Sequence, residues 1–198
     1  MFIKCCFISL FIAISVCVFS QAALPTSYSF DGSPLPTGWL FNLNIAQNGT
    51  TYSNGSDASP SCRLDATGEY VQIHYATQAG SVSYFIRSTG VSPVVAPGTL
   101  FHLQESTNGS VWTNLRQFDI NNLTGSFVQF TDQPSVNARY VRFYYTNKTS
   151  GSNIALDQIL IQDAPAGPNA SIKIKFNSQT LINGGTVFIG NNTNNVFT

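Results

Sequence analysis

The residue with the most unusual surroundings in this chain is Asp157, a single acid within the apolar run IALDQILI. A carboxylate in an apolar strand is costly unless charged partners or hydrogen bonds compensate for its lost hydration. Calcium is one such partner, because it takes carboxylate and carbonyl oxygens without strict geometry. The alternatives are that Asp157 faces solvent or accepts hydrogen bonds from a neighbouring loop. Asp157 is therefore a candidate ligand for a structural metal.

Aromatic side chains provide the second kind of candidate chemistry, the recognition of carbohydrate. The candidates are Tyr52, Trp112, Arg142 and Tyr144. Tyr52 is an aromatic residue alone in the polar, Gly/Asn-rich loop 47–60, and Arg142 lies near Tyr144 in one alternating run, where a cation–π contact or a bound sugar would suit it. Ordinary strand-end packing of Trp112 and cross-strand pairing of the other residues are the structural alternatives.

Groupings that would support catalysis are much weaker. The two histidines, His74 and His102, each lie inside an alternating run, where a polar strand position is the usual role. A Ser-His-Asp triad can be assembled from distant residues in any serine-rich chain, so it carries no specificity. Glycoside hydrolysis needs two acids that face one cleft, whereas the nine acids here lie mostly beside turns. We therefore expect no enzymatic activity from this chain.

Composition and charge narrow the class of protein. Charged residues make up only 9% of the 198 residues, and the formal net charge is zero. Because there is no basic excess, we expect no nucleic-acid partner. Aromatic residues at 13% are enough to build a core, which argues against disorder. Low charge with many β-branched and aromatic residues favours an all-β secreted module.

Residues 1–22 resemble a cleavable signal peptide. Lys4 gives a short positive start, and an apolar run over 5–19 follows that is short for a membrane-spanning helix. The sequence SQA then places small residues where a signal peptidase reads, so we expect cleavage after Ala22, with Ala23 as the alternative. An uncleaved anchor is the other interpretation. Cleavage of this signal helix would leave no membrane span and a secreted or cell-surface protein.

Cysteine usage indicates a domain without disulfides. Cys5, Cys6 and Cys17 would leave with the signal peptide, so Cys62 would be the only cysteine of the mature chain. A cysteine in a strand is most simply a small buried hydrophobe, and pairing with a second chain is the alternative. The domain must then be held together by the burial of its core.

Periodicity predicts short strands throughout the remaining chain. The stretch 138–162 alternates with a period of two on both sides of a Gly/Ser/Asn connection, which is typical of two half-buried strands. Asn108-Gly109 lies between two further alternating runs and predicts a tight hairpin in which both residues take positive φ. About nine or ten strands with intervening turns favour a two-sheet antiparallel β-sandwich. A closed barrel would fit the same pattern.

The chain changes character after residue 163. Residues 23–163 form the predicted sandwich, and 164–170 are a linker rich in Pro and Gly. Residues 171–198 contain further alternating strands but are too few for an independent core. We expect them to be the start of a second β domain that is incomplete here, and a flexible natural tail is the alternative.

Five segments carry a resemblance to a known family of modules. They read SFDGSPLPTGW, SCRLDATGEYVQI, VSYFIRSTG, LQESTNGSVWTNL and RYVRFYYTNKTSGSNIALDQILI. Together they resemble the MAM-like jelly-roll modules of secreted bacterial multidomain proteins, which are related in shape to galactose-binding-like carbohydrate-binding modules. The cysteine framework of eukaryotic MAM domains is missing. The later segment IKIKFNSQTLINGGTVFIG is similar to the opening of immunoglobulin-like, Hydin-like modules.

The resemblance implies a jelly-roll module for binding or adhesion, with a glycan or cell-surface polymer as the expected partner. In galactose-binding-like jelly rolls a structural calcium commonly bridges the first strand to the last. This implies calcium ligands at Asp31, just after the first strand, and at Asp157 in the last strand. A purely structural spacer is one alternative. Another is an accessory module of a secreted hydrolase whose catalytic domain lies beyond residue 198.

Overall fold

The computed structural model describes an all-β protein. The described residues are 20–43, 56–57, 60–90, 97–149, 152–165, 174–176 and 179–181. The predicted signal helix and Tyr52 therefore lie outside them. Contacts divide the chain into two units, Met1–Asp163 and Ala164–Thr198. Within the described ranges, no helix has the length and hydrophobicity needed to cross a bilayer.

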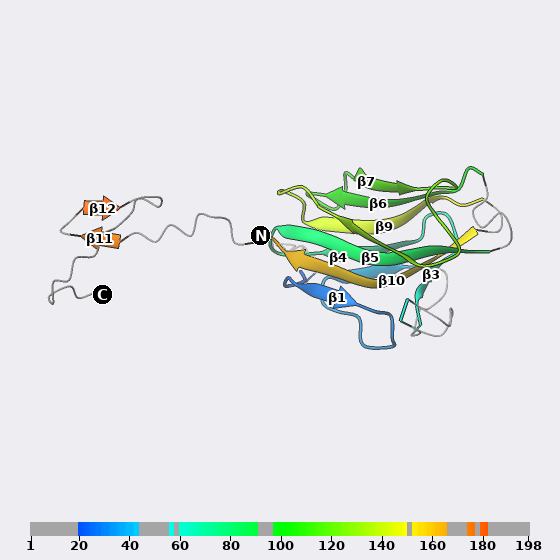
Figure 1. Ribbon diagram of the computed structural model, residues 1–198, viewed down its shortest axis with the longest axis horizontal. Coiled ribbons are helices and arrows are strands. Elements are labelled where there is room, and N and C mark those ends of the chain that lie inside the picture. The colour runs from blue at the N-terminus through cyan, green and yellow to red at the C-terminus, as the bar shows by residue number, and fades with distance from the viewer. Residues whose placement is uncertain are drawn as a thin grey trace, which may run out of the picture. The chain divides into compact units, whose positions relative to one another are not determined.

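Ten strands of the first unit form two sheets (Figure 1). The first sheet has the order β1-β10-β5-β8, with β3 also paired to β10, and the second has the order β2-β4-β9-β6-β7. The strands are β1 (Thr26–Tyr28), β2 (Trp39–Asn42), β3 (Cys62–Leu64), β4 (Tyr70–His74), β5 (Ala79–Gly90), β6 (Leu100–Ser106), β7 (Thr113–Phe118), β8 (Val128–Asp132), β9 (Tyr140–Asn147) and β10 (Ser152–Asp163).

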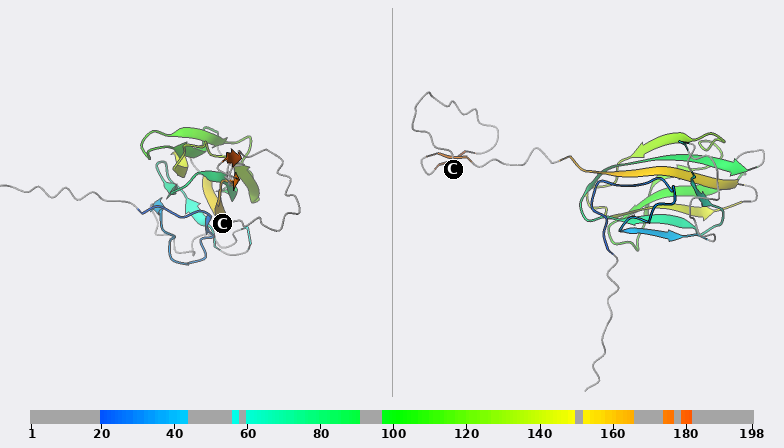
Figure 2. Two further views of the ribbon diagram at one scale, coloured as in Figure 1. Left: turned by 90° about the vertical axis from the view of Figure 1, so that its left-hand side faces the viewer. Right: turned by 90° about the horizontal axis from the view of Figure 1, so that it is seen from below.

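The two sheets are stacked as the layers of a β-sandwich, as the views in Figures 1 and 2 show. Every strand pair within them is antiparallel. The predicted fold class is thus confirmed, and the alternative of one closed barrel is excluded. The stretch 138–162 forms β9 and β10 as expected, but these strands belong to different sheets, so their connection crosses from one layer to the other.

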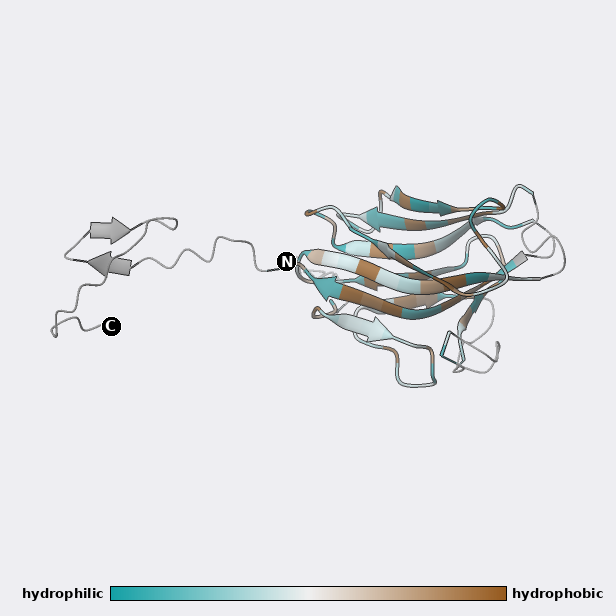
Figure 3. Cartoon of the chain, viewed as in Figure 1, coloured by the Kyte–Doolittle hydropathy of each residue, from teal (hydrophilic) through white to brown (hydrophobic). Residues whose placement is uncertain are grey.

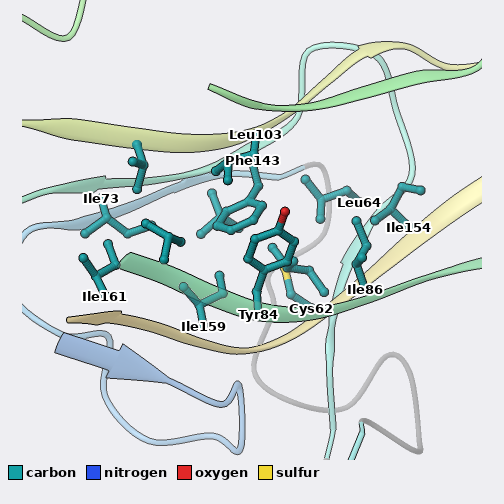
Figure 4. Close-up of a cluster of buried hydrophobic side chains, with 14 of the residues drawn as sticks. Cys62, Leu64, Ile73, Tyr84, Ile86, Leu103, Phe143, Ile154, Ile159 and Ile161 are labelled. Carbon is teal, nitrogen blue, oxygen red and sulfur yellow. The ribbon is translucent and has the colours of Figure 1, made fainter. Parts of the chain in front are cut away.

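The core lies between the layers and follows from the alternation of side chains along each strand. Apolar residues recur at every second position of β4, β5 and β9, and those side chains point inward. Figure 3 shows the resulting bands of hydrophobic and hydrophilic residues along the strands. Fully or almost fully buried members, drawn in Figure 4, include Cys62, Leu64, Ile73, Tyr84, Ile86, Leu103, Phe143, Ile154, Ile159 and Ile161. Cys62 is a buried free thiol, as the sequence indicates.

A β-bulge interrupts the alternation of β10. The register to β5 shifts between Asp157 and Leu160, and Gln158 has a φ of 45°, in the left-handed region. Leu156 before the bulge and Ile159 after it are both buried. The inward face therefore changes from even to odd residue numbers, and the strict period of two expected across this strand is wrong at one point.

The connection between β6 and β7 differs from the predicted hairpin turn. The strands pair as expected, but the connection spans residues 107–112, and of Asn108 and Gly109 only Gly109 has positive φ, at 74°. The side chain of Asn108 instead accepts hydrogen bonds from the N–H groups of Ser110 and Val111. This Asx-type turn does not need Asn108 in the left-handed region, and it extends the connection so that Trp112 lies at its end.

Ala22 is part of the sandwich. It forms a parallel bridge with Tyr75, its N–H donates to the carbonyl of His74 at 2.7 Å, and its side chain is 2% exposed. Gly38 allows this close approach, because a Cβ there would lie 2.3 Å from the Ala22 nitrogen. Cleavage at the predicted site after Ala22 would remove this bridge from the domain.

The second unit is described only as a hairpin. Its strands β11 (Ile174–Phe176) and β12 (Gln179–Leu181) pair antiparallel. The first strand falls within the alternating segment that the sequence assigns to a second β domain. The proposed completion of that domain beyond residue 198 stays a prediction.

Candidate functional site

Five side chains form a stacked row on the outer face of the β2-β4-β9-β6-β7 sheet. Tyr140, Arg142 and Tyr144 alternate along β9 with the buried residues of that strand and so point away from the core. His74 contributes from the neighbouring β4, and Trp112 from the connection before β7. All five are half-buried. We call His74, Tyr140, Trp112, Arg142 and Tyr144 the stacked row.

Arg142 lies between two aromatic rings of this row. Its guanidinium carbon is 4.1 Å from the centre of the Trp112 ring and 4.2 Å from that of Tyr144. Each such contact stabilises the cation by about 0.5–2 kcal/mol, depending on how far it is desolvated. Burial lowers the pKa of Arg142, and the nearby phenols of Tyr144 and Tyr70 oppose that shift. The guanidinium is therefore in contact with two aromatic rings of the row.

A series of hydrogen-bonded amide side chains orients the same arginine. Arg142 Nε donates to Gln104 Oε1 at 2.7 Å, and Gln104 Nε2 donates to Asn114 Oδ1 at 2.7 Å. These residues are aligned by the registers of β9 with β6 and of β6 with β7. Gln72 pairs with Arg142 from β4, on the opposite side. The stacked row is thus flanked by neutral amides that can both donate and accept hydrogen bonds.

The packing of Tyr140, at the other end of the stacked row, depends on Gly109. The His74 and Tyr140 rings stack at 4.0 Å with 9° between their planes, and Tyr140 meets Trp112 edge-on at 6.3 Å. A Cβ at Gly109 would lie 3.1 Å from the Tyr140 ring. Tyr140 therefore packs directly against the backbone of the β6–β7 connection, which positions Trp112. Burial lowers the pKa of His74, and its Nε2 lies 2.9 Å from the Gln21 amide nitrogen.

Three of the four ligand-binding candidates named from the sequence come together in this row. Trp112, Arg142 and Tyr144 are neighbours, and the predicted cation–π contact of Arg142 with Tyr144 is present. Tyr52 lies outside the described residues. Sequence reasoning did not identify His74, Gln104 or Asn114 as members of the site. The strand order that brings them together is not visible in periodicity.

A groove of about 490 Å³ lies on the outer face of the other sheet. It is lined by residues of β1, β5, β8 and β10, among them the half-buried Phe85, and by the segment after β1. Lining residues include Ser27, Asp31, Pro34, Ser83, Phe85, Gln129, Gln158 and Leu160, of which only Asp31 is charged. The groove is the second surface of this module that a polar ligand would fit.

Asp157 is fully buried and fastens a loop to β10. Its Oδ2 accepts hydrogen bonds from the Ser56 N–H at 2.7 Å and the Ser56 hydroxyl at 3.0 Å, and its Oδ1 accepts one from the Gln158 N–H at 2.8 Å. The Gln158 side chain donates to Asp57 at 2.7 Å. Burial raises the pKa of Asp157, the donors on Ser56 and Gln158 oppose this, and the charge of Asp57 adds to it.

Asp31 does not share partners with Asp157. It is exposed, and hydrogen bonds from the side chain and the backbone of Ser33 lower its pKa; the Ser33 N–H lies 3.0 Å from its Oδ1. The acid whose charge acts on Asp157 is Asp57. Among the described residues, no group of three or more His, Cys, Asp or Glu could hold a metal ion. Calcium at Asp31 and Asp157 stays a prediction for metal analysis to check.

Comparison with known proteins gives a fold but no family. No protein-family model and no curated protein matches the chain. The K1 cleaved adhesin domain of Lys-gingipain from Porphyromonas gingivalis W83 aligns with a TM-score of 0.55 at 15% identity, over 71% of this chain and 98% of that chain.

Two further structures are similar. The K3 cleaved adhesin domain of the same protein aligns with a TM-score of 0.54 at 12% identity, over 69% of this chain and 96% of that chain. A mutant of the carbohydrate-binding module CBM29-2 gives 0.44 at 10% identity, over 70% of this chain and 94% of that chain. The chain therefore shares its β-sandwich fold with the cleaved adhesin domains.

Proposed function

We propose that the sandwich is a non-catalytic module that binds glycans on the outer face of the β2-β4-β9-β6-β7 sheet. The observation that carries this proposal is the stacked row of four aromatic or imidazole rings and one arginine on that face. Aromatic residues that are half-buried and held rigidly supply contact area at little cost in conformational entropy. The apolar faces of sugar rings pack on such surfaces.

The polar neighbours of the row suit the hydroxyl groups of a sugar. Gln72, Gln104 and Asn114 flank Arg142 on three neighbouring strands. Their amides each offer donors and acceptors, and the Gln104 amide is already oriented by its bonds to Arg142 and Asn114. A ligand therefore meets planar polar groups that need little rearrangement on binding, which favours affinity.

The context of this activity is part of the proposal. The signal-like segment 1–22 supports a secreted or cell-surface location. The sandwich fold shared with adhesin domains supports a binding role, and the resemblance to MAM-like modules supports the proposal that the module belongs to a larger extracellular protein. We propose that the module works there as a binding or adhesion unit and carries out no chemistry itself.

A glycan array followed by titration tests the function. The chain has two tryptophans, and Trp39 is 6% exposed in the core, so a ligand on the stacked row should alter mainly the fluorescence of the half-buried Trp112. For any glycan that binds, Trp112→Ala and Tyr144→Ala should each weaken affinity by about tenfold or more, as expected for aromatic anchors. Phe127→Ala, which removes a ring beneath Arg87 away from the row, is the control.

These measurements distinguish the stacked row from the groove as the binding site, and a binding module from a structural spacer. Binding that survives both row variants but is lost in Phe85→Ala would move the site to the groove on the other sheet. The absence of binding across plant, bacterial and host glycans would refute the binding function and favour a structural spacer. Comparable melting temperatures of all variants are required, so that a loss of affinity is not a loss of fold.

A further inference from the structure

Arg142 is a half-buried cation without an acidic partner. The ion pairs among the described residues are Arg63–Asp65 and Arg116–Asp132, and Arg142 belongs to neither. Its cross-strand neighbours are the neutral residues Gln72 and Gln104. A charge that is partly removed from water and has no counter-ion is in an unfavourable position. A bound anion would relieve it.

The contacts of Arg142 leave its two terminal nitrogens available to a ligand. The guanidinium carbon lies over the rings of Trp112 and Tyr144, and Nε donates to Gln104. No described residue accepts a hydrogen bond from either terminal nitrogen. These two nitrogens form a planar fork whose spacing matches the two oxygens of a carboxylate. Because the fork is already oriented by its neighbours, a ligand carboxylate finds it preorganised.

The surroundings restrict the ligand further. The flanking side chains of the face are amides and aromatic rings, which suit hydroxyl groups and sugar rings. The net charge of the chain is zero, so a densely charged polyanion such as a nucleic acid gains no long-range attraction. One isolated fork fits a ligand whose negative charges are carboxylates on separate sugar units.

On this basis, and resting on the glycan-binding function proposed above, we propose that the module recognises acidic glycans, with the carboxylate of a uronic or sialic acid bound by the terminal nitrogens of Arg142. Trp112 and Tyr144 hold the guanidinium and offer their outer edges to the sugar ring. Gln104 and Asn114 lie beside the fork and take up neighbouring hydroxyls. No reaction accompanies binding.

Matched pairs of ligands test this assignment. The full chain is titrated with uronic-acid oligosaccharides and their methyl esters, and with sialyllactose and lactose, at about 0.15 M salt. For at least one pair, the form with the free carboxylate should bind at least about tenfold more tightly than its uncharged partner. Arg142→Gln should abolish that preference while keeping the affinity for the neutral form. Arg142→Lys, which keeps the charge but loses the fork, should retain only part of the preference.

Arg87→Gln provides the matched control. It removes one positive charge and one arginine–aromatic contact, that with Phe127, on the other sheet. The preference for acidic ligands should survive in this variant. Melting temperatures of all three variants show whether each remains folded, and Arg142→Lys keeps the test decisive if Arg142→Gln does not fold.

The possible failures are distinguishable. Equal binding of acidic and neutral partners by the wild type would overturn the acidic-glycan assignment and leave the glycan-binding function intact. A preference that persists in both Arg142 variants, or one that appears only for sulfated sugars, would also overturn it. If the wild type binds neither member of any pair nor any glycan on the array, the proposed function itself fails.

Discussion

Replacing Asp157 by asparagine tests whether hydrogen bonds or a cation hold this buried acid in the sheet. An amide keeps one oxygen and turns the other into an NH₂ group. In one orientation that group faces the N–H of Ser56, and in the other it faces the N–H of Gln158. Either way, a buried donor loses its acceptor, and the attachment of the loop at Ser56 is weakened or the bulge is disturbed.

The size of the effect follows from these contacts. A buried N–H group left without an acceptor costs about 1–3 kcal/mol, and removal of a fully buried charge offsets part of that cost. We expect a net loss of about 1–2 kcal/mol in the free energy of unfolding, which lowers the melting temperature by about 2–8 °C for a chain of this length. Asp31→Asn, at an exposed turn, should change the melting temperature much less.

The pH dependence gives the sharper test. Burial holds the folded-state pKa of Asp157 above its ordinary value of 3.8. The folded state therefore binds this proton more tightly than the unfolded state does. Wild-type protein gains stability from this group as the pH falls through the folded pKa, and the gain is complete below the unfolded pKa. Asparagine has no such gain, so the difference between the two proteins should widen on acidification.

Thermal unfolding followed by circular dichroism measures this difference. Wild type, Asp157→Asn and Asp31→Asn are compared at about pH 7 and about pH 4.5, with and without EDTA. EDTA should leave all three melting temperatures unchanged. A difference that narrows as the pH falls would contradict the raised pKa of Asp157. A wild-type melting temperature that EDTA lowers would show that a bound cation stabilises the fold. The calcium prediction would then be right and the hydrogen-bond account wrong.

Three further predictions follow from single contacts. Gly109→Ala should destabilise the fold by about 1 kcal/mol or more, because φ is 74° and the new Cβ would lie 3.1 Å from the Tyr140 ring. Thermal melting measures the loss of stability, and glycan titration measures the effect on the stacked row. Cys62 is fully buried and burial raises its pKa well above its usual value, so Ellman's reagent should modify it only after unfolding; rapid labelling of native protein would contradict this. A chain that begins at Ala23 should melt at a lower temperature than one that begins at Gln21, because it lacks the Ala22 bridge to Tyr75.

The alternation of side chains along β9 could be read from the sequence and was enough to predict part of the site. A period of two places Arg142 and Tyr144 on one face, and adjacent positions of one face are within contact distance. The approach of Trp112 could not be predicted in the same way. It depends on β6 lying between β7 and β9, and sheet order leaves no trace in periodicity.

Hydrogen bonds from a neighbouring loop were one alternative that the sequence offered for Asp157, but the particular donor, Ser56, could not be predicted. The sequence suggested Asp31 because it follows the first strand, and β1 does pair with β10. The bulge at Gln158, however, is unpredictable from a period of two, and it accompanies the docking of Ser56 and Asp57 on this part of β10. A polar loop that is distant in sequence thus supplies hydrogen-bond donors to Asp157, where a metal ion was expected.

Asp157 and Arg142 illustrate why charge placement alone does not identify a binding residue. Both stand in alternating strands, so the sequence marks them equally, although Asp157 is fully buried and Arg142 is half-buried. Asp157 accepts three hydrogen bonds on its two oxygens, from Ser56 and from the backbone of Gln158. Arg142 is held by two aromatic rings and at Nε, yet its terminal nitrogens have no acceptor among the described residues. Of the two charges, the arginine is the one whose surroundings are complete only when a ligand is bound.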